Sequence, residues 1–305
     1  MQIHFGEELL RAEWSAAVVC LGTFDGVHLG HQAVISAAVQ AARTKRLPCV
    51  LLTFDRHPAA ILAPKRCPKQ IASLASNLEA FAKLGVAAAI VLPFTLERSQ
   101  TPAEAFFEDV IVMRVRGTEI VVGHDFAFGK NRLGTPDWLK TRIETDEIPP
   151  FEIDGVRVSS SGIRQSIMEG DVEQAARWLG RQFDIEGIVV SGKQLGRTLG
   201  FPTINLARSV DGVLPKDGIY AGLARIGTER YAAAISIGFR PTVEGENRTL
   251  EAYLIDYSGR DIYGEPVTLE FHRRVRDEAK FDSLDELKAQ MAHDVEFTSN
   301  VIRLV

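Results

Sequence analysis

The chain has few cysteines, and their number and spacing exclude two classes of protein. Its 305 residues contain only three, Cys20, Cys49 and Cys67. A small odd number excludes a disulfide framework, and no two of them have the spacing of metal ligands. Cys20 and Cys49 lie in apolar runs, so we expect them in the core. Residues 1–14 carry charges where a signal peptide would be apolar, and we therefore expect a reducing, cytoplasmic environment.

The sequence also lacks long apolar runs and an excess of positive charge. No apolar run approaches the ~18 residues of a membrane span, so we expect no membrane association. The formal net charge is -5, whereas nucleic-acid backbones bind to basic surfaces. We therefore expect small molecules rather than nucleic acid as partners, and the oligomeric state is left open. The length predicts about two domains.

The first half of the chain alternates strand-like and helix-like segments. Continuously apolar runs, which predict buried strands, cover residues 16–21, 48–54, 87–92 and 119–123. Helix-like segments between and after them cover residues 32–46, 71–84 and 103–115. This alternation predicts an α/β domain with a doubly wound parallel sheet. In such sheets ligands bind at the carboxyl ends of the strands, which here lead into residues 22–31, 55–58 and 123–129.

The first of these loops has the features of a phosphate-binding turn. It joins a strand to a helix, where backbone N–H groups and the helix dipole attract anions. Gly22, Gly26 and Gly30 permit a tight backbone and the close approach of a ligand. His28 and His31 are three residues apart, which places both imidazoles on one face of the first helical turn. Together these features predict a nucleotide site.

From about residue 183 the pattern changes to short β-like runs separated by Gly, Pro and Asp turns. The runs cover residues 185–190, 219–226, 231–237, 250–257 and 267–271. Regularly spaced short strands without helices predict a small closed or nearly closed barrel. Capping residues predict short helices after the serines at 159–161 and after Asp171, and a final helix after Ser283. We therefore predict two domains, residues 1–183 and 184–305.

The most specific motif is Gly196-Arg-Thr-Leu-Gly-Phe-Pro-Thr-Ile-Asn205. Gly196 and Gly200 let the backbone close over phosphates. Thr203 and Asn205 are two residues apart, so on an extended segment both side-chain oxygens point the same way. Oxygen ligands of this kind suit Mg²⁺, with nucleotide phosphates completing its coordination.

Together these motifs resemble the prokaryotic bifunctional riboflavin kinase/FAD synthetase family, and the resemblance extends from about residue 15 to 295. It implies an N-terminal FMN adenylyltransferase domain, related to the H-x-G-H nucleotidyltransferases, and a C-terminal kinase domain of six-stranded barrel type with a terminal helix. It also implies two reactions. Riboflavin and ATP give FMN and ADP, and then FMN and ATP give FAD and pyrophosphate, with Mg²⁺ as the cofactor.

In the kinase half, the resemblance makes Glu251 the general base for the 5′-hydroxyl of riboflavin. Thr203 and Asn205 are the implied Mg²⁺ ligands, and Arg276 and Phe281 match the segment that borders the flavin. The implied ATP-binding residues of this half are Gly196, Gly200 and Pro202.

In the first half, the resemblance makes His28, His31 and Arg164 the residues that act on the ATP phosphates as the FMN phosphate attacks. Asp125 and Phe128 are implied to border the flavin. The implied ATP- and phosphate-binding residues of this half are Gly22, Phe24, Gly26, Gly30, Ser159 and Ser160.

The chain departs from the family where positive charge is expected. Family members commonly have arginine at Ala127, a basic residue at Gly162, a lysine near Asn77 and proline at Arg56. These departures leave a second interpretation open, a riboflavin kinase whose adenylyltransferase domain is impaired or acts on another phosphate-bearing acceptor. A third interpretation is a non-catalytic flavin-binding regulatory protein. Retention of Glu251 argues against it, because a binding protein needs no general base.

Overall fold

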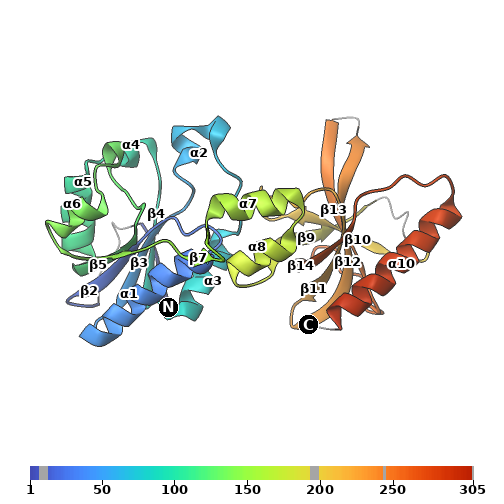
Figure 1. Cartoon of the computed structure of the whole chain (residues 1–305), viewed down its shortest axis with the longest axis horizontal. Helices are drawn as coiled ribbons and strands as arrows, with labels where there is room; N and C mark the ends of the chain where they lie inside the picture. The colour runs from blue at the N-terminus through green and yellow to red at the C-terminus, as the bar shows by residue number, and fades with distance from the viewer. Residues whose placement is uncertain (7–12, 193–198, 243–244, 304–305) are drawn as a thin grey trace. The chain divides into compact units, whose positions relative to one another are not determined.

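The structure, a computed structural model, describes residues 1–6, 13–192, 199–242 and 245–303. The chain folds into two compact units (Figure 1). The first comprises Met1–Lys69 and Ser73–Ser160, and the second comprises Gln70–Ala72 and Ser161–Val305. Each unit has its own sheet, so each is described by itself.

The first unit contains a six-stranded sheet with strand order β1-β4-β3-β2-β5-β6. Every pairing between neighbouring strands is parallel, which confirms the predicted parallel sheet. Its strands are β1 (Gln2–Phe5), β2 (Ala17–Leu21), β3 (Cys49–Phe54), β4 (Ala88–Leu92), β5 (Gly117–Gly123) and β6 (Glu144–Ile148). The two edge strands, β1 and β6, were not predicted, because neither is a continuously apolar run.

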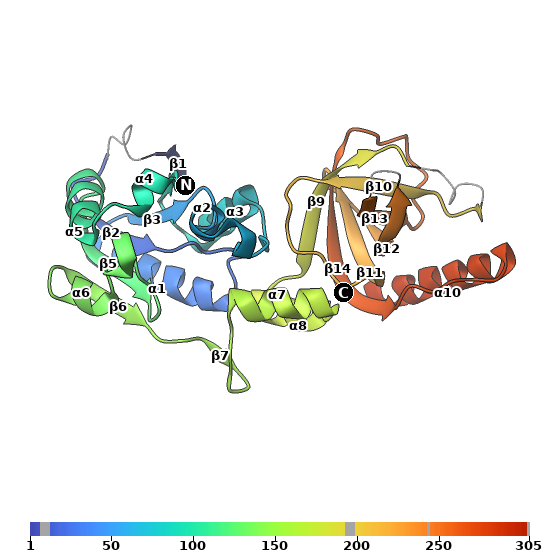
Figure 2. The same cartoon turned by 90° about the horizontal axis from the view of Figure 1, so that it is seen from above.

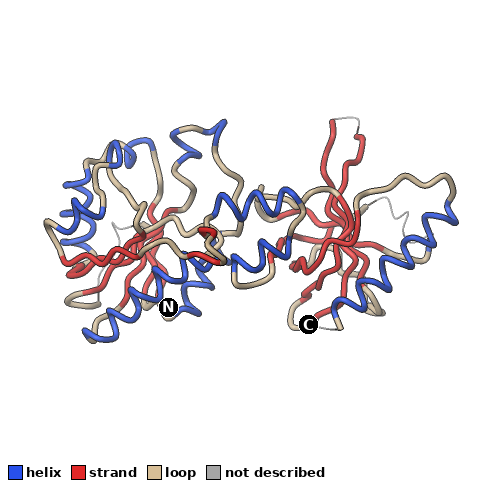
Figure 3. Tube along the Cα trace, in the orientation of Figure 1, coloured by secondary structure: helices blue, strands red, loops and turns tan. Residues whose placement is uncertain are grey.

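Helices cover both faces of this sheet, as Figure 3 shows. On one face, α1 (Leu29–Lys45) and α3 (Leu74–Leu84) pack against alternate residues of the strands, Cys20 among them. On the other face lie α5 (Ala103–Phe106), the π-helical segment η2 (Phe107–Arg114) and α6 (Pro136–Lys140). Both faces are therefore buried, which confirms the doubly wound architecture.

The remaining elements of the first unit are short. They are α2 (Ala59–Leu62), η1 (Pro64–Arg66), α4 (Leu96–Ser99), η3 (Lys130–Arg132), β7 (Glu152–Ile153) and β8 (Val156–Arg157). The cysteines are free, and Cys20 and Cys49 are buried as predicted. Burial raises the pKa of the Cys49 thiol to about 12. It is therefore a core residue rather than a reactive one.

The order of the strands sets where a ligand can bind. From β2 the chain moves through β3 to β4 on one side, and later places β5 on the other side of β2. The reversal of direction lies between β2 and β5, and in open parallel sheets ligands bind at that point, beyond the carboxyl ends of the strands. The loops that follow β2 and β5 are therefore the ones that matter for a site.

The second unit contains a closed barrel of six strands in the order β10-β13-β12-β11-β14-β9. All its pairings are antiparallel, and β9 closes the barrel on β10. The strands are β9 (Phe183–Val190), β10 (Thr203–Arg208), β11 (Gly218–Ile226), β12 (Glu229–Thr242), β13 (Gly245–Leu254) and β14 (Pro266–Arg276). This confirms the predicted barrel.

In the described part of the second unit, three helices accompany the barrel strands. They are α7 (Ser160–Glu169), α8 (Val172–Leu179) and α10 (Leu284–Ile302), and α10 packs beside the barrel (Figure 2). Two of the predicted caps are present, because Asp171 accepts from the N–H of Gln174 at 2.9 Å and Ser283 accepts from that of Glu286 at 3.2 Å. The predicted helix at the serines begins within them, at Ser160. Among the described residues, no helix combines the length and apolar character needed to cross a membrane.

Asp184 on β9 is a half-buried acid whose ionisation opposes folding of the barrel. It lies opposite Glu270 of β14. Burial raises the pKa of Asp184 to about 6, and the charge on Glu270 acts in the same direction. Because the folded-state pKa lies above the unfolded value of ~4, the protonated acid is favoured in the fold. The free energy of unfolding therefore falls as the pH rises from the unfolded pKa of ~4 to the folded pKa of about 6.

We expect Asp184→Asn to stabilise the protein by up to ~3 kcal/mol near pH 7.5, because the amide removes the cost of a buried charge. The gain should shrink by roughly half near pH 5, where the folded acid is protonated. Urea unfolding at the two pH values measures this, with exposed Asp261→Asn as the control. A gain that does not change with pH, or a loss near pH 7.5, would contradict this explanation.

Candidate active sites

The turn after β2 has an unusual backbone. Three of its residues have positive φ angles, Gly26 at 79°, Phe24 at 47° and Val27 at 41°. Such angles are costly for residues other than glycine, most of all for a β-branched residue. The side chains of Phe24 and Val27 are nevertheless 3% and 1% exposed, so the core packs around this conformation. Among Gly22, Gly26 and Gly30, only Gly26 has a positive φ angle, which favours glycine.

Gly22 and Gly30 make room for side chains of the same turn. A Cβ atom on Gly22 would lie 2.6 Å from Cζ of Phe24, and one on Gly30 would lie 3.2 Å from the His28 ring. The missing side chains therefore leave space for an aromatic ring and an imidazole. Their predicted role beside the phosphates stays a prediction.

The structure brings the two predicted histidines together at the start of α1. His28 is the N-cap of this helix, and its Nδ1 atom accepts a hydrogen bond from the N–H of His31 at 3.3 Å. Their rings stack with centroids 3.6 Å apart, and the edge of Phe24 meets His31 at 5.4 Å. Because Nδ1 of His28 accepts, its ring proton lies on Nε2. The pair thus lies at the positive end of α1.

The loop after β5 presents Asp125 with a cationic partner that the sequence did not reveal. Arg157 of β8 donates to Oδ2 of Asp125 at 2.5 Å, and Arg132 donates to its backbone carbonyl at 3.2 Å. Partial burial raises the pKa of Asp125, but the hydrogen bond and charge of Arg157 lower it by more, so the pKa lies below its usual value. Asp125 is therefore a carboxylate beside two guanidinium groups.

Phe128 lies in the core of the first unit. Its ring is 8% exposed and packs on Phe106 and Trp138 at centroid distances of 5.5 and 5.7 Å. A Cβ atom on Gly134 would lie 2.3 Å from this ring. Phe128 therefore anchors the loop that carries Asp125.

The serine segment before α7 lies against the turn after β2. Oγ of Ser160 donates to the backbone carbonyl of Asp25 at 3.4 Å, and the carbonyl of Val158 lies 3.5 Å from where a Cβ of Gly30 would be. Ser159 precedes them on the same segment, and Arg164 follows Ser160 by one turn on the same face of α7. The predicted serines are thus placed beside the predicted phosphate turn.

Two of the positions at which the chain departs from its family, Arg56 and Asn77, form hydrogen bonds within the fold. The guanidinium of Arg56 donates to Asp55 at 2.8 and 3.0 Å, so its charge is paired with a neighbouring carboxylate. Asn77 is buried, and its side-chain oxygen accepts from the N–H of Gly26 at 3.1 Å. Ala127 and Gly162 are half-buried.

In the second unit, strand register brings together the three residues predicted to bind metal and remove a proton. Asn205 of β10 lies directly opposite Glu251 of β13, and Oγ1 of Thr203 donates to Oε2 of Glu251 at 3.1 Å. Leu206, which follows Asn205, and Ala252, which follows Glu251, are both buried in the core. The three polar side chains therefore share the outward face of the barrel wall.

The approach to this face is lined by residues of the long motif. A Cβ atom on Gly192 would lie 2.3 Å from Nδ2 of Asn205, so a glycine is needed there. Gly200 has a φ of 86° and open space around it, while Phe201, next to Pro202, packs on Tyr253 at 5.4 Å. Gly196, a predicted phosphate-binding residue, lies outside the described residues.

Arg276 and Phe281, the residues predicted to border the flavin, lie near each other, with the guanidinium carbon 5.8 Å from the ring centroid. The guanidinium also donates to both oxygens of Asp294 on α10, at 3.0 and 2.7 Å. Asp294 is 4% exposed. The ion pair therefore holds the end of β14 against α10.

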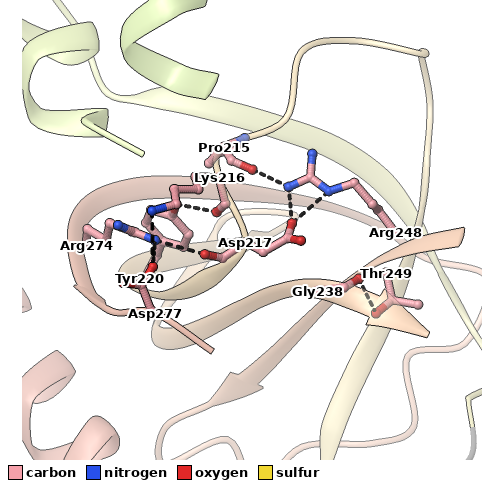
Figure 4. Close-up of polar contacts among 9 residues, drawn as sticks. All are labelled: Pro215, Lys216, Asp217, Tyr220, Gly238, Arg248, Thr249, Arg274 and Asp277. Atoms are coloured by element: carbon pink, nitrogen blue, oxygen red, sulfur yellow. Dashed lines mark hydrogen bonds and ion pairs between the residues drawn. The ribbon is translucent and has the colours of Figure 1, made fainter. Parts of the chain in front are cut away.

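Sequence reasoning missed a polar network that joins β13 to the end of β14, which Figure 4 shows. Arg248, three residues before Glu251, donates to the carboxylate of Asp217 and to the carbonyl of Pro215. Arg274 donates to the carbonyl of Asp217 at 2.9 Å and to Asp277 at 2.6 Å. These charged residues are far apart in the chain, and cations come to lie next to anions only in the fold. No spacing of residues in the sequence could therefore have predicted the network.

The donor types of the second site favour a hard metal ion. Within the ranges that the structure describes, no cluster of three or more His, Cys, Asp or Glu side chains could hold a metal. The hydroxyl of Thr203, the amide of Asn205 and the carboxylate of Glu251 are all oxygen donors on one face. Mg²⁺ is commonly bound by few protein oxygens together with substrate phosphates, and this set fits that pattern.

Two protein families match this chain, one over most of the α/β unit and the other over the barrel. Residues 10–162 match the FAD synthetase family, and residues 179–302 match the riboflavin kinase family. The bifunctional riboflavin kinase/FMN adenylyltransferase of Listeria monocytogenes is 34% identical and covers 97% of this chain and 96% of its own length. That of Escherichia coli (strain K12) is 34% identical, with 94% and 93% covered.

A solved structure shares this fold over almost its whole length. It is described as a macrolide-efflux protein from Streptococcus pneumoniae, with a TM-score of 0.91 and 34% sequence identity. The match covers 98% of this chain and 99% of that one. An α/β unit followed by a barrel is thus an architecture already seen in an experimental structure.

We expect Gly22→Ala to destabilise the first unit by about 1–3 kcal/mol, because the added methyl group would displace the buried Phe24 ring. Urea unfolding measures the change. Gly123→Ala is a matched control, since the nearest atoms to its added methyl group lie at 3.8 Å. Equal stability of the two variants would show that the Gly22 position tolerates a side chain.

Proposed function

The chain belongs to the bifunctional riboflavin kinase/FMN adenylyltransferase family, and we propose here how its two sites divide the chemistry. It is an enzyme that phosphorylates riboflavin to FMN and adenylylates FMN to FAD, with ATP as the donor in both reactions. The proposal rests above all on one observation. Thr203, Asn205 and Glu251 share one face of the barrel, while the histidine pair lies in the other unit.

In the kinase site, Glu251 acts as the general base. Its carboxylate accepts the proton of the riboflavin 5′-hydroxyl as that oxygen attacks the γ-phosphorus of ATP, and ADP leaves. The hydrogen bond from Thr203 at 3.1 Å holds the carboxylate in place. Thr203 and Asn205 would hold Mg²⁺, which supplies positive charge to the ATP phosphates. Gly196, Gly200 and Pro202 border those phosphates in this proposal.

Arg276 and Phe281 border the flavin of the kinase site in this proposal. The segment that carries Phe281 is joined to the barrel by the ion pair of Arg276 with Asp294 and by the network of Arg274 with Asp277. Both anchors involve β14. The flavin-bordering segment is therefore positioned by the barrel rather than by its own short sequence.

In the adenylyltransferase site, the phosphate of FMN attacks the α-phosphorus of ATP and pyrophosphate leaves. His28 and His31, at the N-terminus of α1, donate to the phosphates. The resemblance assigns Ser159, Ser160 and Arg164 to the same phosphates. No covalent intermediate is needed, because orientation and charge stabilisation are enough for such a displacement. Asp125 borders the flavin in this proposal.

Two further points belong to the same proposal. The functional boundary is placed between residues 183 and 184, beside the start of the first barrel strand, β9, at Phe183, whereas the compact units divide between Ser160 and Ser161. The protein acts in the cytoplasm, a location supported by its free cysteines, two of which are buried. We extend no efflux function to the chain, since both of its halves match the flavin enzyme families.

We expect Glu251→Gln to lower the rate of FMN formation by roughly 100-fold or more, because the amide cannot accept the proton. Conversion of added FMN to FAD should remain at the wild-type rate. Chromatography of reactions that start from riboflavin or from FMN, with ATP and Mg²⁺, separates the two activities. Loss of both activities in a folded variant would contradict separate sites.

We expect His31→Ala to have the reverse effect, lowering FAD formation about 100-fold because a donor to the phosphates is lost. FMN should still form from riboflavin and accumulate. The wild-type protein, assayed in parallel, should form FMN first and FAD later. Wild-type protein that stops at FMN would instead favour an impaired adenylyltransferase unit, as the charge losses at Ala127 and Gly162 allow.

A further inference from the structure

The turn after β2 adopts a conformation that its own sequence disfavours. Phe24 and Val27 both have left-handed backbone angles, which L-residues with side chains rarely adopt. A strained backbone of this kind persists only where surrounding groups determine it, and such strain is concentrated at functional sites. The groups that enforce this turn should therefore matter for the chemistry at its end.

Besides the Ser160 hydroxyl, side chains of α3 and α1 bond to the backbone of this turn. The side-chain oxygen of Asn77 on α3 accepts from the N–H of Gly26 at 3.1 Å. The side-chain amide of Gln32 on α1 donates to the carbonyl of Val27 at 2.9 Å. The neighbouring residues Gly26 and Val27 of the strained turn are thus held from two helices.

Asn77 is an unusual residue for its position. It lies on α3 and is only 8% exposed, whereas asparagine is disfavoured inside helices and a buried polar side chain requires a partner. Its partner is the N–H of Gly26, 51 residues away in the chain. Asparagine lowers the stability of α3, and its hydrogen bond to the N–H of Gly26 gives a reason for its presence there.

The turn leads directly into the histidine pair. His28, the N-cap of α1, follows Val27, and His31 bonds back to it. The ring of Phe24 contacts both His31, at 5.4 Å, and Phe81 of α3, at 5.8 Å. A change in the backbone at residues 24–27 would therefore move the imidazoles that face the phosphates.

We propose that Asn77 and Gln32 are positioning residues of the adenylyltransferase site, which hold the strained turn so that the histidine pair and the N-terminus of α1 face the ATP phosphates. This inference rests on the proposed function of the first unit. Neither side chain needs to touch substrate. They act by fixing the position of the turn, because the rate of the reaction depends on how accurately the reacting groups are placed.

The test uses Asn77→Leu, which keeps the size of the side chain but removes the acceptor, and Gln32→Leu, which removes the donor. For FMN adenylylation, each should raise the KM for ATP and lower kcat, with kcat/KM falling about tenfold or more, because misplacement of about 1 Å can cost 100-fold. Riboflavin kinase activity of the same protein should stay within about twofold of wild type, since distant sites act independently.

The control is Glu79→Ala, an exposed position two residues further along α3, which should leave both activities unchanged. A variant that only loses folded protein would show a lower kcat with an unchanged KM for ATP. That result, or variants equal to wild type, would overturn the inference while the proposed function stands. Wild-type protein that forms no FAD would overturn the proposed function itself.

Discussion

Strand register is the physical constraint on which both sites depend. In the barrel, antiparallel pairing places Asn205 opposite Glu251, and Thr203 reaches the same carboxylate from the next position on that face. A slip of one residue would turn one strand's side chains to the opposite face of the sheet. In the first unit, parallel register aligns the carboxyl ends of β2 and β5, and so places their loops at one edge.

Much of this arrangement was predictable because it follows from local spacing. The alternation of apolar runs with helices predicts the parallel sheet, and the i, i+3 spacing of His28 and His31 predicts neighbouring rings on one helical turn. The i, i+2 spacing of Thr203 and Asn205 likewise predicts a shared face, which the pairing of β10 and β13 confirms. Each of these signals needs only a few consecutive residues.

What the sequence could not reveal depends on contacts between distant segments. The pairing of Asp125 with Arg157 and that of Arg276 with Asp294 form only in the fold. Phe128 reads as a loop residue beside Asp125 and yet packs in the core, because Gly134 leaves space for its ring. The edge strands β1 and β6 were not predicted, because an edge strand does not need to be continuously apolar.

The central claim is that this chain carries two separate active sites, one for each reaction. The most direct test mixes the Glu251→Gln protein with the His31→Ala protein and supplies riboflavin, ATP and Mg²⁺. Each variant alone should make FAD about 100-fold more slowly than the wild type, whereas the mixture should make it much faster than either alone, because FMN released by one protein can be adenylylated by the other. A mixture that makes FAD no faster than the single variants, or that forms FMN but no FAD, would contradict the claim.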